Sequence, residues 1–302
     1  MHADEVILDG QLVHAMVMAQ CPQWANRPLE LVDSAGTDHA LYRLGDEFLV
    51  RLPRRPPAAP QVRKETRWLP KLGDGLPLAI PAPRFLGQGI DDYPFEWAIY
   101  DWLEGDSPPS DLLAGDEAAA RALADFLIAL HRLDASAGPL AGDQNHQRGL
   151  PLPSRDRAVR QALEAVDALG VSSAYALSIW RDYLDVEPWK ATPRWVHGDI
   201  QAGNVLYLDG HLHAVIDFGL LGIGDPAVDL AVAWTAFNAG PRELFRAALS
   251  DRYPGFDALW ARARGWAFSI ALIQLPYYAG KSAGMEAMAR RTLREVFADH
   301  EM

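Results

Sequence analysis

The segment from Trp195 to Gly219 constrains the fold of this chain more than any other part of the sequence. It holds two short apolar runs, residues 205–208 and 212–216, separated by Asp209-Gly210. This dipeptide favours a two-residue β-hairpin turn, because both turn positions must tolerate a positive φ. The segment is therefore predicted to form a hairpin, with polar residues directly before and after it.

Pairing the two strands outward from this turn predicts their register. Leu206 is expected opposite His213, and Asn204 opposite Val215. Asp217 follows Val215 by two residues, so its side chain should lie on the same face as that of Asn204. Diagonal neighbours of this kind are roughly 7–8 Å apart. An amide oxygen and a carboxylate at such a distance can share a Mg²⁺ ion, which takes oxygen ligands.

Asp199 lies on the loop that leads into the hairpin, five residues before Asn204. A carboxylate there is placed to accept a proton from a hydroxyl that attacks the γ-phosphate of a nucleotide. The alternative is a surface hairpin with ordinary loop acids, since Asp and Asn are common near turns. Three such groups in register favour the functional interpretation.

Three motifs in this order and spacing resemble those of the aminoglycoside phosphotransferase-like kinases. These are small-molecule relatives of the protein kinases, and they include macrolide and other antibiotic kinases. The motifs are HGDIQAGN at residues 197–204, IDFG at 216–219 and GDPAVDLA at 224–231. The resemblance implies an α+β, bilobal protein-kinase-like fold, with a small β-rich N-lobe and a larger α-helical C-lobe.

The resemblance also implies roles for single residues. Asp199 would be the catalytic base, and Asn204 and Asp217 would be the ligands of Mg²⁺. Asp229 would hold the catalytic loop from a buried helix, and His197 would support the same loop. For Asp229, a partly exposed acid near a helix N-terminus is the alternative.

The expected lobes divide the chain into an N-lobe at residues 1–100, a hinge at 101–105 and a C-lobe at 106–302. Residue patterns in the N-lobe predict a helix at 12–19, a helix after Pro60, and strands at 29–32, 40–44 and 47–52. Patterns in the C-lobe predict a surface loop at 140–155, a helix around Asp229 and helices at 117–133, 154–168, 175–184, 243–248, 258–278 and 285–297.

The loop at residues 33–39 could fold its N–H groups over the phosphates of a nucleotide. Ser34, Gly36 and Thr37 are the candidate contacts. An ordinary hairpin turn explains its one glycine almost as well, and the resemblance favours the phosphate contact. The chain has no G-x-x-x-x-G-K-[ST] run, so it is not a P-loop protein.

Arg51 occupies the strand that carries the phosphate-binding lysine in the family. Arginine also suits phosphate, with a rigid fork in place of a point charge. In the helix after Pro60, Glu65 falls on the inward apolar stripe. A buried acid needs a cation, and Arg51 is the predicted partner of Glu65. The alternative is a Glu65 side chain in solvent, bonded to an arginine of its own helix.

Residues 97–105 are predicted as a strand that ends at a break, and the resemblance makes this region the hinge. Backbone groups there would bond the adenine or guanine edge. Backbone contacts leave no side-chain signature, so the sequence does not distinguish ATP from GTP. The nucleotide-binding candidates here and on the hairpin are Tyr100, Asp101, Leu103, Leu206 and Ile216.

Five side chains of the C-lobe are candidates to line an acceptor pocket beneath Asp199. They are Trp234, Trp266, Gln274, Tyr277 and Tyr278. Packing in the helical core is the alternative for each of them, because aromatic side chains dominate cores as well as pockets.

The formal net charge of −12 argues against a nucleic-acid-binding protein, which needs a basic face. Nine acidic and no basic residues occupy positions 85–120. Their field would attract a cationic acceptor, although an acidic surface that aids solubility explains them as well. No apolar run has the length of a membrane span, and the N-terminus lacks the basic start of a signal peptide. With Cys21 as the one cysteine, these features predict a cytoplasmic protein.

Seven residues separate Asp217 from Asp225, which leaves no room for a peptide-presenting activation segment. We therefore expect transfer of the γ-phosphate of ATP or GTP to a hydroxyl of a small molecule. By resemblance the acceptor is an aminoglycoside, a macrolide or another antibiotic. The alternatives are a metabolic kinase of the choline, homoserine or sugar type, and a nucleotide-binding pseudokinase, suggested by Arg51 in place of lysine.

Overall fold

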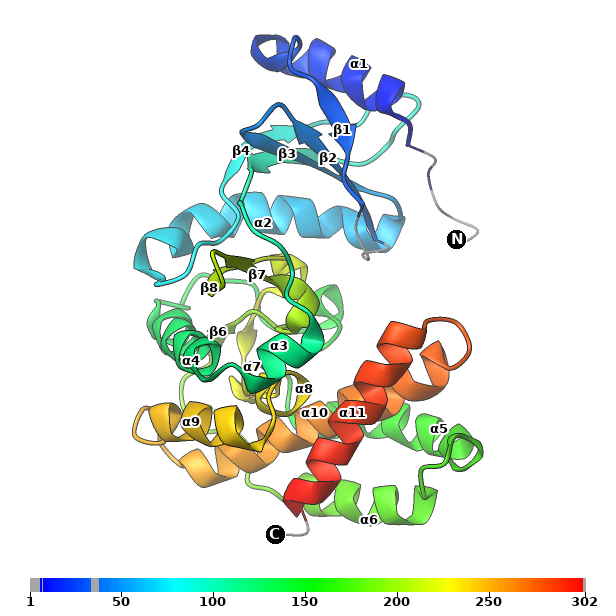
Figure 1. Ribbon diagram of the computed structural model, residues 1–302, viewed down its shortest axis with the longest axis vertical. Helices are drawn as coiled ribbons and strands as arrows, with labels where there is room; N and C mark the ends of the chain where they lie inside the picture. Colours follow the sequence, from blue (N-terminus) through cyan, green and yellow to red (C-terminus); the bar gives the residue numbers. More distant parts are fainter. Residues whose placement is uncertain (1–5, 7, 34–37, 301–302) are drawn as a thin grey trace.

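The computed structural model describes residue 6, residues 8–33 and residues 38–300. Figure 1 shows a small lobe built on a sheet above a larger lobe built mainly of helices. This confirms the predicted α+β, protein-kinase-like architecture. In the described part of the chain, no helix is both long and apolar enough to cross a membrane.

The small lobe contains a five-stranded antiparallel sheet with the strand order β1-β2-β3-β5-β4. The three N-terminal strands follow the prediction closely, whereas β4 was not predicted, because prolines precede and begin it. The strands are β1 Leu29–Leu31, β2 His39–Leu44, β3 Phe48–Pro53, β4 Pro83–Gly87 and β5 Trp97–Asp101.

Two helices cover the two faces of this sheet. Helix α1 (Gly10–Gln20) packs with Cys21, Val50 and Leu52 in a separate apolar core, and Cys21 is an ordinary buried apolar side chain there. Helix α2 (Ala59–Leu72) lies on the other face, toward the large lobe. Because side chains alternate along a strand, Arg51 points away from the α1 core and toward α2.

The large lobe is organised around α10, which packs against α5, α7 and α11. The predicted amphipathic helix is α4, whose apolar stripe is buried as expected. The predicted helix around Asp229 is two short helices, α7 and α8. The helices are α3 Ser110–Gly115, α4 Glu117–Arg132, α5 Asp156–Val166, α6 Ser173–Leu184, α7 Ala227–Leu230, α8 Val232–Thr235, α9 Ala239–Leu249, α10 Phe256–Tyr278 and α11 Ala283–His300.

Two small two-stranded sheets carry the segment that the sequence singled out. They pair β6 (Arg194–Val196) with β9 (Gly222–Gly224), and β7 (Val205–Leu208) with β8 (His211–Val215). Short 3₁₀ turns punctuate the chain at Pro22–Trp24, Pro56–Ala58, Gly73–Gly75, Asp143–Asn145, Leu152–Arg155, Asp167–Leu169, Ala202–Asn204 (η7) and Phe218–Leu220 (η8).

The predicted hairpin is present, but its predicted register is wrong. Asp209 and Gly210 have φ of +52° and +80°, as the turn requires. A bulge between Leu206 and Tyr207 then shifts the pairing, so that Leu206 lies opposite Ala214 instead of His213. The main chain of Asn204 consequently accepts a hydrogen bond from Ile216, at 2.9 Å, and does not face Val215.

Both strands of the bulged hairpin bond to segments outside it. Tyr207 exchanges two main-chain hydrogen bonds with Asp106, at 2.9 and 3.0 Å. On the other edge, Ala79 bonds the main chains of His213 and Val215, at 3.1 and 2.9 Å. Each strand is thus tied to a distant segment, and the local pattern of the hairpin alone could not reveal the extra residue.

Candidate active site

The loop that carries Asp199 is anchored by the buried carboxylate of Asp229. One oxygen of Asp229 accepts a hydrogen bond from the main-chain N–H of Gly198 at 2.7 Å, and the other accepts from that of His197 at 2.9 Å. Gly198 has a φ of +84°, a conformation that glycine adopts without strain. Asp229 is 1% exposed, so these two bonds are shielded from water.

A histidine that the sequence analysis did not identify completes this anchor. His131 Nε2 lies 3.0 Å from Asp229 Oδ2, and its Nδ1 lies 2.7 Å from the hydroxyl of Tyr253. Both rings are buried. His131 lies at the end of α4 and Tyr253 in the turn before α10, and neither segment carries a local motif that would have predicted the contact.

His197 connects the Asp199 loop to the segment that carries Asp217. Its Nδ1 accepts a hydrogen bond from the main-chain N–H of Asp199 at 3.2 Å, so the proton of the neutral ring resides on Nε2. Nε2–H can then donate to the carbonyl of Ile216, 3.0 Å away. The ring also packs edge-on against Phe218. One side chain therefore joins the two loops that hold the acidic groups.

Asp199 stands at the mouth of the loop, with its side chain 30% exposed. Its Oδ2 accepts hydrogen bonds from the side-chain amides of Gln201 at 3.1 Å and Asn204 at 3.2 Å. Burial raises the pKa of this carboxyl above its ordinary value, although the nearby Arg148 guanidinium opposes the shift. A carboxylate with a raised pKa takes up a proton more readily, which suits a general base.

Arg51 sits between two acids at the junction of the lobes. Its Nη1 donates to Glu65 at 3.1 Å, which confirms the predicted ion pair, and its Nη2 donates to Asp217 at 2.7 Å. The hydroxyl of Tyr100 donates to the second oxygen of Glu65 at 2.7 Å. His39 Nδ1 lies 3.4 Å from Arg51 Nη2, a neighbour that the sequence analysis did not identify.

The acids of this network titrate differently. Burial would raise the pKa of Asp217, but the charge and hydrogen bond of Arg51 outweigh it and lower the pKa to about 2. Burial raises the pKa of Glu65, even with Arg51 beside it. Asp217 is therefore a permanent anion at physiological pH.

Replacing Arg51 with Met should destabilise the fold, because it leaves the buried Glu65 without its cation. We expect a loss of about 3 kcal/mol at pH 8, measured by urea unfolding, and a smaller loss for Arg51→Lys. Without Arg51 the folded protein binds a proton at Glu65 more readily than the unfolded chain does. The loss should therefore shrink as the pH falls toward 5. Equal stability of wild type and Arg51→Met at pH 8 would contradict this account.

The remaining nucleotide-binding candidates are distributed along the junction. Asp101 uses its side chain to bind Arg84 and its N–H to bind Ala82. The main chain of Leu103 has no hydrogen-bond partner among the described residues, so it is available to a base. Tyr100 is buried, and its hydroxyl serves Glu65. Leu206 and Ile216 are half-buried on the hairpin, while Ser34, Gly36 and Thr37 lie outside the described residues.

The side chains of Asn204 and Asp217 have the chemistry that ligands of a Mg²⁺ ion need. Asn204 directs its side-chain NH₂ group to Asp199, and no described residue donates a hydrogen bond to its side-chain oxygen Oδ1. The Asp217 side chain is 46% exposed, so the carboxylate can be reached from solvent. Two protein oxygens suffice, since Mg²⁺ usually keeps several waters and binds substrate phosphates.

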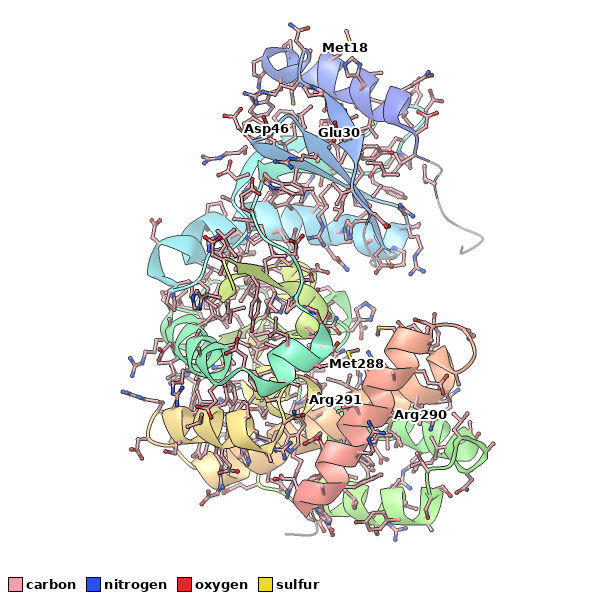
Figure 2. The ribbon with its side chains drawn as sticks, in the orientation of Figure 1. Met18, Glu30, Asp46, Met288, Arg290 and Arg291 are labelled. Atoms are coloured by element: carbon pink, nitrogen blue, oxygen red, sulfur yellow. The ribbon has the colours of Figure 1, made fainter. Side chains whose placement is uncertain are left out.

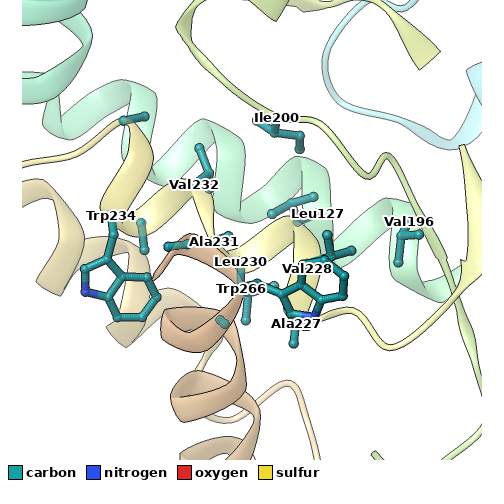
Figure 3. Packing of buried hydrophobic residues seen from close by; sticks show 14 of the residues in the cluster. Leu127, Val196, Ile200, Ala227, Val228, Leu230, Ala231, Val232, Trp234 and Trp266 are labelled. Atoms are coloured by element: carbon teal, nitrogen blue, oxygen red, sulfur yellow. The ribbon is translucent and has the colours of Figure 1, made fainter. Parts of the chain in front are cut away.

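A cavity of about 380 Å³ opens beside Asp199. Gln274 and Tyr278 contribute to its wall, as predicted. Trp234 and Trp266 are fully buried in the helical core shown in Figure 3, so placing them in the pocket was wrong. Tyr277 is 52% exposed and is not part of the wall. The apolar spacing of helices does not separate core from pocket.

Another part of this cavity wall comes from a segment that was predicted as a surface loop. In residues 140–155, Asn145 and Arg148 are buried. Asn145 donates to the carbonyls of Arg148 at 2.8 Å and Leu220 at 3.3 Å, which ties the segment to the turn after Asp217. Its polar, glycine-rich composition concealed a packed wall that also contains His146 and Arg155.

A smaller cavity of about 30 Å³ touches Asp199 from the side of α11. Met288, which Figure 2 marks on this helix, and Thr292 line it together with Gln274. Helix α11 thus closes this side of the Asp199 loop.

Comparison with known proteins agrees with this geometry. Residues 31–266 match the profile of the Phosphotransferase enzyme family. A search of curated protein sequences found no match. Because the profile covers well over half of the chain, the protein belongs to this family.

Three solved structures illustrate the shared fold. The GDP and kanamycin complex of APH(2")-IIia is similar over 95% of this chain and 99% of its own, with 20% identity and a TM-score of 0.73. Macrolide 2'-phosphotransferase MphH from Brachybacterium faecium is similar over 94% and 97%, with 22% identity and a TM-score of 0.63. The streptomycin-ATP-APH(2")-IIa ternary complex is similar over 95% and 99%, with 19% identity and a TM-score of 0.61.

Proposed function

We propose that this member of the phosphotransferase enzyme family transfers the γ-phosphate of ATP or GTP to a hydroxyl of a small molecule. The observation that carries the proposal is the position of Asp199. Its carboxylate opens onto the 380 Å³ cavity and is held in the same loop as Asn204, next to the anionic Asp217. Similar structures that contain GDP or ATP support a nucleotide donor.

In the proposed step, the acceptor oxygen attacks the γ-phosphorus and forms the new P–O bond. The bond from the γ-phosphorus to the β,γ-bridging oxygen breaks, and its electron pair leaves with the nucleoside diphosphate. Asp199 orients the acceptor hydroxyl and takes its proton. Bound through Asn204 and Asp217, Mg²⁺ would supply positive charge opposite the transferring group.

The other residues of the site have supporting roles in this proposal. Arg51 steadies the phosphates and is itself held by Glu65. Leu103, Leu206 and Ile216 flank the base, with the lobes divided at the hinge, residues 101–105. Ser34, Gly36 and Thr37 contact the phosphates. We further propose that the reaction takes place in the cytoplasm, where ATP and GTP are available.

The acceptor class is a separate part of the proposal. Among the similar structures are a kanamycin complex, a streptomycin complex and a macrolide phosphotransferase, which support an antibiotic acceptor. A metabolic kinase for choline, homoserine or a sugar uses the same chemistry. A nucleotide-binding pseudokinase remains the non-catalytic alternative, because Arg51 replaces the family's lysine.

An acceptor screen tests this proposal. Release of nucleoside diphosphate would be followed with antibiotics, sugars, amino alcohols and hydroxy acids, with and without a Mg²⁺ chelator. We expect acceptor-dependent release that the chelator abolishes. Turnover of a sugar or amino alcohol alone would contradict the antibiotic acceptor. Nucleotide binding without release for any acceptor would favour the pseudokinase.

A further inference from the structure

The wall of the acceptor cavity carries two arginines that the transfer step does not use. Arg148 and Arg155 both line the cavity, and Asp199 is the one acidic residue of that wall. This charge is opposite to the one expected from the acid-rich segment at residues 85–120. The wall therefore favours a ligand group other than an ammonium.

The treatment of buried arginines elsewhere in the chain sharpens this contrast. Among the described residues, Arg51, Arg242 and Arg262 are also buried, and each has a carboxylate oxygen within 2.9 Å. Arg148 is 9% exposed, yet its nearest carboxylate, that of Asp199, is 3.8 Å away. A buried guanidinium without a close carboxylate is costly, so its retention points to a functional partner.

The second guanidinium lacks even that partial compensation. Arg155 forms no ion pair with any described residue, and its Nε has no hydrogen-bond partner among them. Nε and Nη1 of Arg148 likewise have no hydrogen-bond partner among the described residues. Burial, and then the charge of Arg148, lower the pKa of Arg155 to about 10. Both groups also lie near the ring of Trp266, at 6.0 Å for Arg148 and 5.5 Å for Arg155.

We infer that the acceptor of this enzyme carries an anionic oxyacid group, a carboxylate or a phosphate, which Arg148 and Arg155 bind while its hydroxyl faces Asp199. An oxyanion in the cavity would offset the positive charge of two neighbouring guanidinium groups that line it without a close carboxylate, and arginine donors suit such a group. The ring of Trp266 supports the guanidinium planes from behind. This inference rests on the proposed function for the hydroxyl but not for the anion site itself.

Calorimetric titration with inorganic phosphate and with succinate tests the anion site. The protein would be saturated with ADP and Mg²⁺, so that the donor site is filled. We expect one or both anions to bind with a millimolar Kd, weakened about tenfold by Arg155→Gln, the loss of one charge-assisted hydrogen-bonding group. The anion that binds more tightly shows whether the anionic group of the acceptor is a phosphate or a carboxylate. Arg157→Gln, an exposed arginine on α5, should leave binding unchanged.

Two results would overturn the inference. One is the absence of binding by either anion, and the other is binding that Arg155→Gln does not weaken. Titration with glucosamine serves as the opposite test, since tighter binding of this cation than of either anion would also count against it.

Turnover separates this inference from the proposed function. Once acceptors are found, Arg155→Gln should raise KM for those with a carboxylate or phosphate and change kcat less. If all acceptors are cationic or neutral and their KM does not change in Arg155→Gln, the kinase function is supported and the anion site is refuted. If anion binding depends on Arg155 but no acceptor is phosphorylated, the anion site is supported and the kinase function is refuted.

Discussion

The Asp199→Asn variant should transfer phosphate about a thousandfold more slowly than the wild type, within the range that a general base contributes. Asparagine keeps the size of the side chain and its contact with Asn204, but it cannot take up the proton of the attacking hydroxyl. Nucleotide affinity should change by less than about twofold, because the main-chain carbonyl of residue 199, which holds the amide of Asn204 at 2.8 Å, is kept in the variant. Steady-state kinetics with any active acceptor and a separate nucleotide titration measure both effects.

Asp251→Asn provides a matched control for this variant. Asp251 is exposed on the turn after α9 and has no hydrogen bond or ion pair with a described residue. Its kinetics should equal those of the wild type. If Asp199→Asn kept more than about a tenth of the wild-type kcat, the proton would leave by another route, and the role of Asp199 would be limited to orientation.

Local sequence patterns predicted those parts of the site whose partners lie on neighbouring elements. The apolar stripe of α2 placed Glu65 inward, and strand alternation placed Arg51 on the face that meets it; the ion pair followed from these two periodicities. The Asp209-Gly210 turn likewise needed no information from beyond the hairpin. Such features are encoded within one or two adjacent elements.

Contacts between distant segments were not predictable in the same way. The bulged hairpin is bonded by Asp106 and Ala79, which come from other parts of the chain. The bond between His131 and Asp229 joins residues 98 positions apart. These residues resemble many others in loops and at helix ends. Their contacts can therefore be recognised only in the folded chain.

The acceptor cavity shows the same limit from the opposite side. Trp234 and Trp266 are of a residue type that is common in pockets, yet both are buried in the helical core. Arg148 and Arg155 belong to a stretch that is rich in glycine and proline, as exposed loops are. Both nevertheless line the cavity. The charge of the cavity is therefore a property of the fold, and the net charge of the chain does not predict it.

The Asp229→Asn substitution should destabilise the fold strongly. Its two oxygens accept from the N–H groups of His197 and Gly198, and one of them also meets His131. In Asp229→Asn, the new NH₂ group must face one of these buried donors. We expect a loss of about 2–4 kcal/mol in the free energy of unfolding, as for other buried charged groups deprived of their hydrogen bonds.

Urea unfolding of wild type, Asp229→Asn and Asp251→Asn measures this loss. The midpoint should fall for Asp229→Asn at an unchanged m-value, and Asp251→Asn should stay within about 0.5 kcal/mol of the wild type. Because Asp229 holds the two residues before Asp199, kcat should fall as well, even at urea-free conditions where the variant is fully folded. A variant with the wild-type midpoint but low kcat would show that Asp229 positions the loop without stabilising the lobe. A wild-type midpoint together with a wild-type kcat would show that the loop holds its shape through His197 and Ile216 alone.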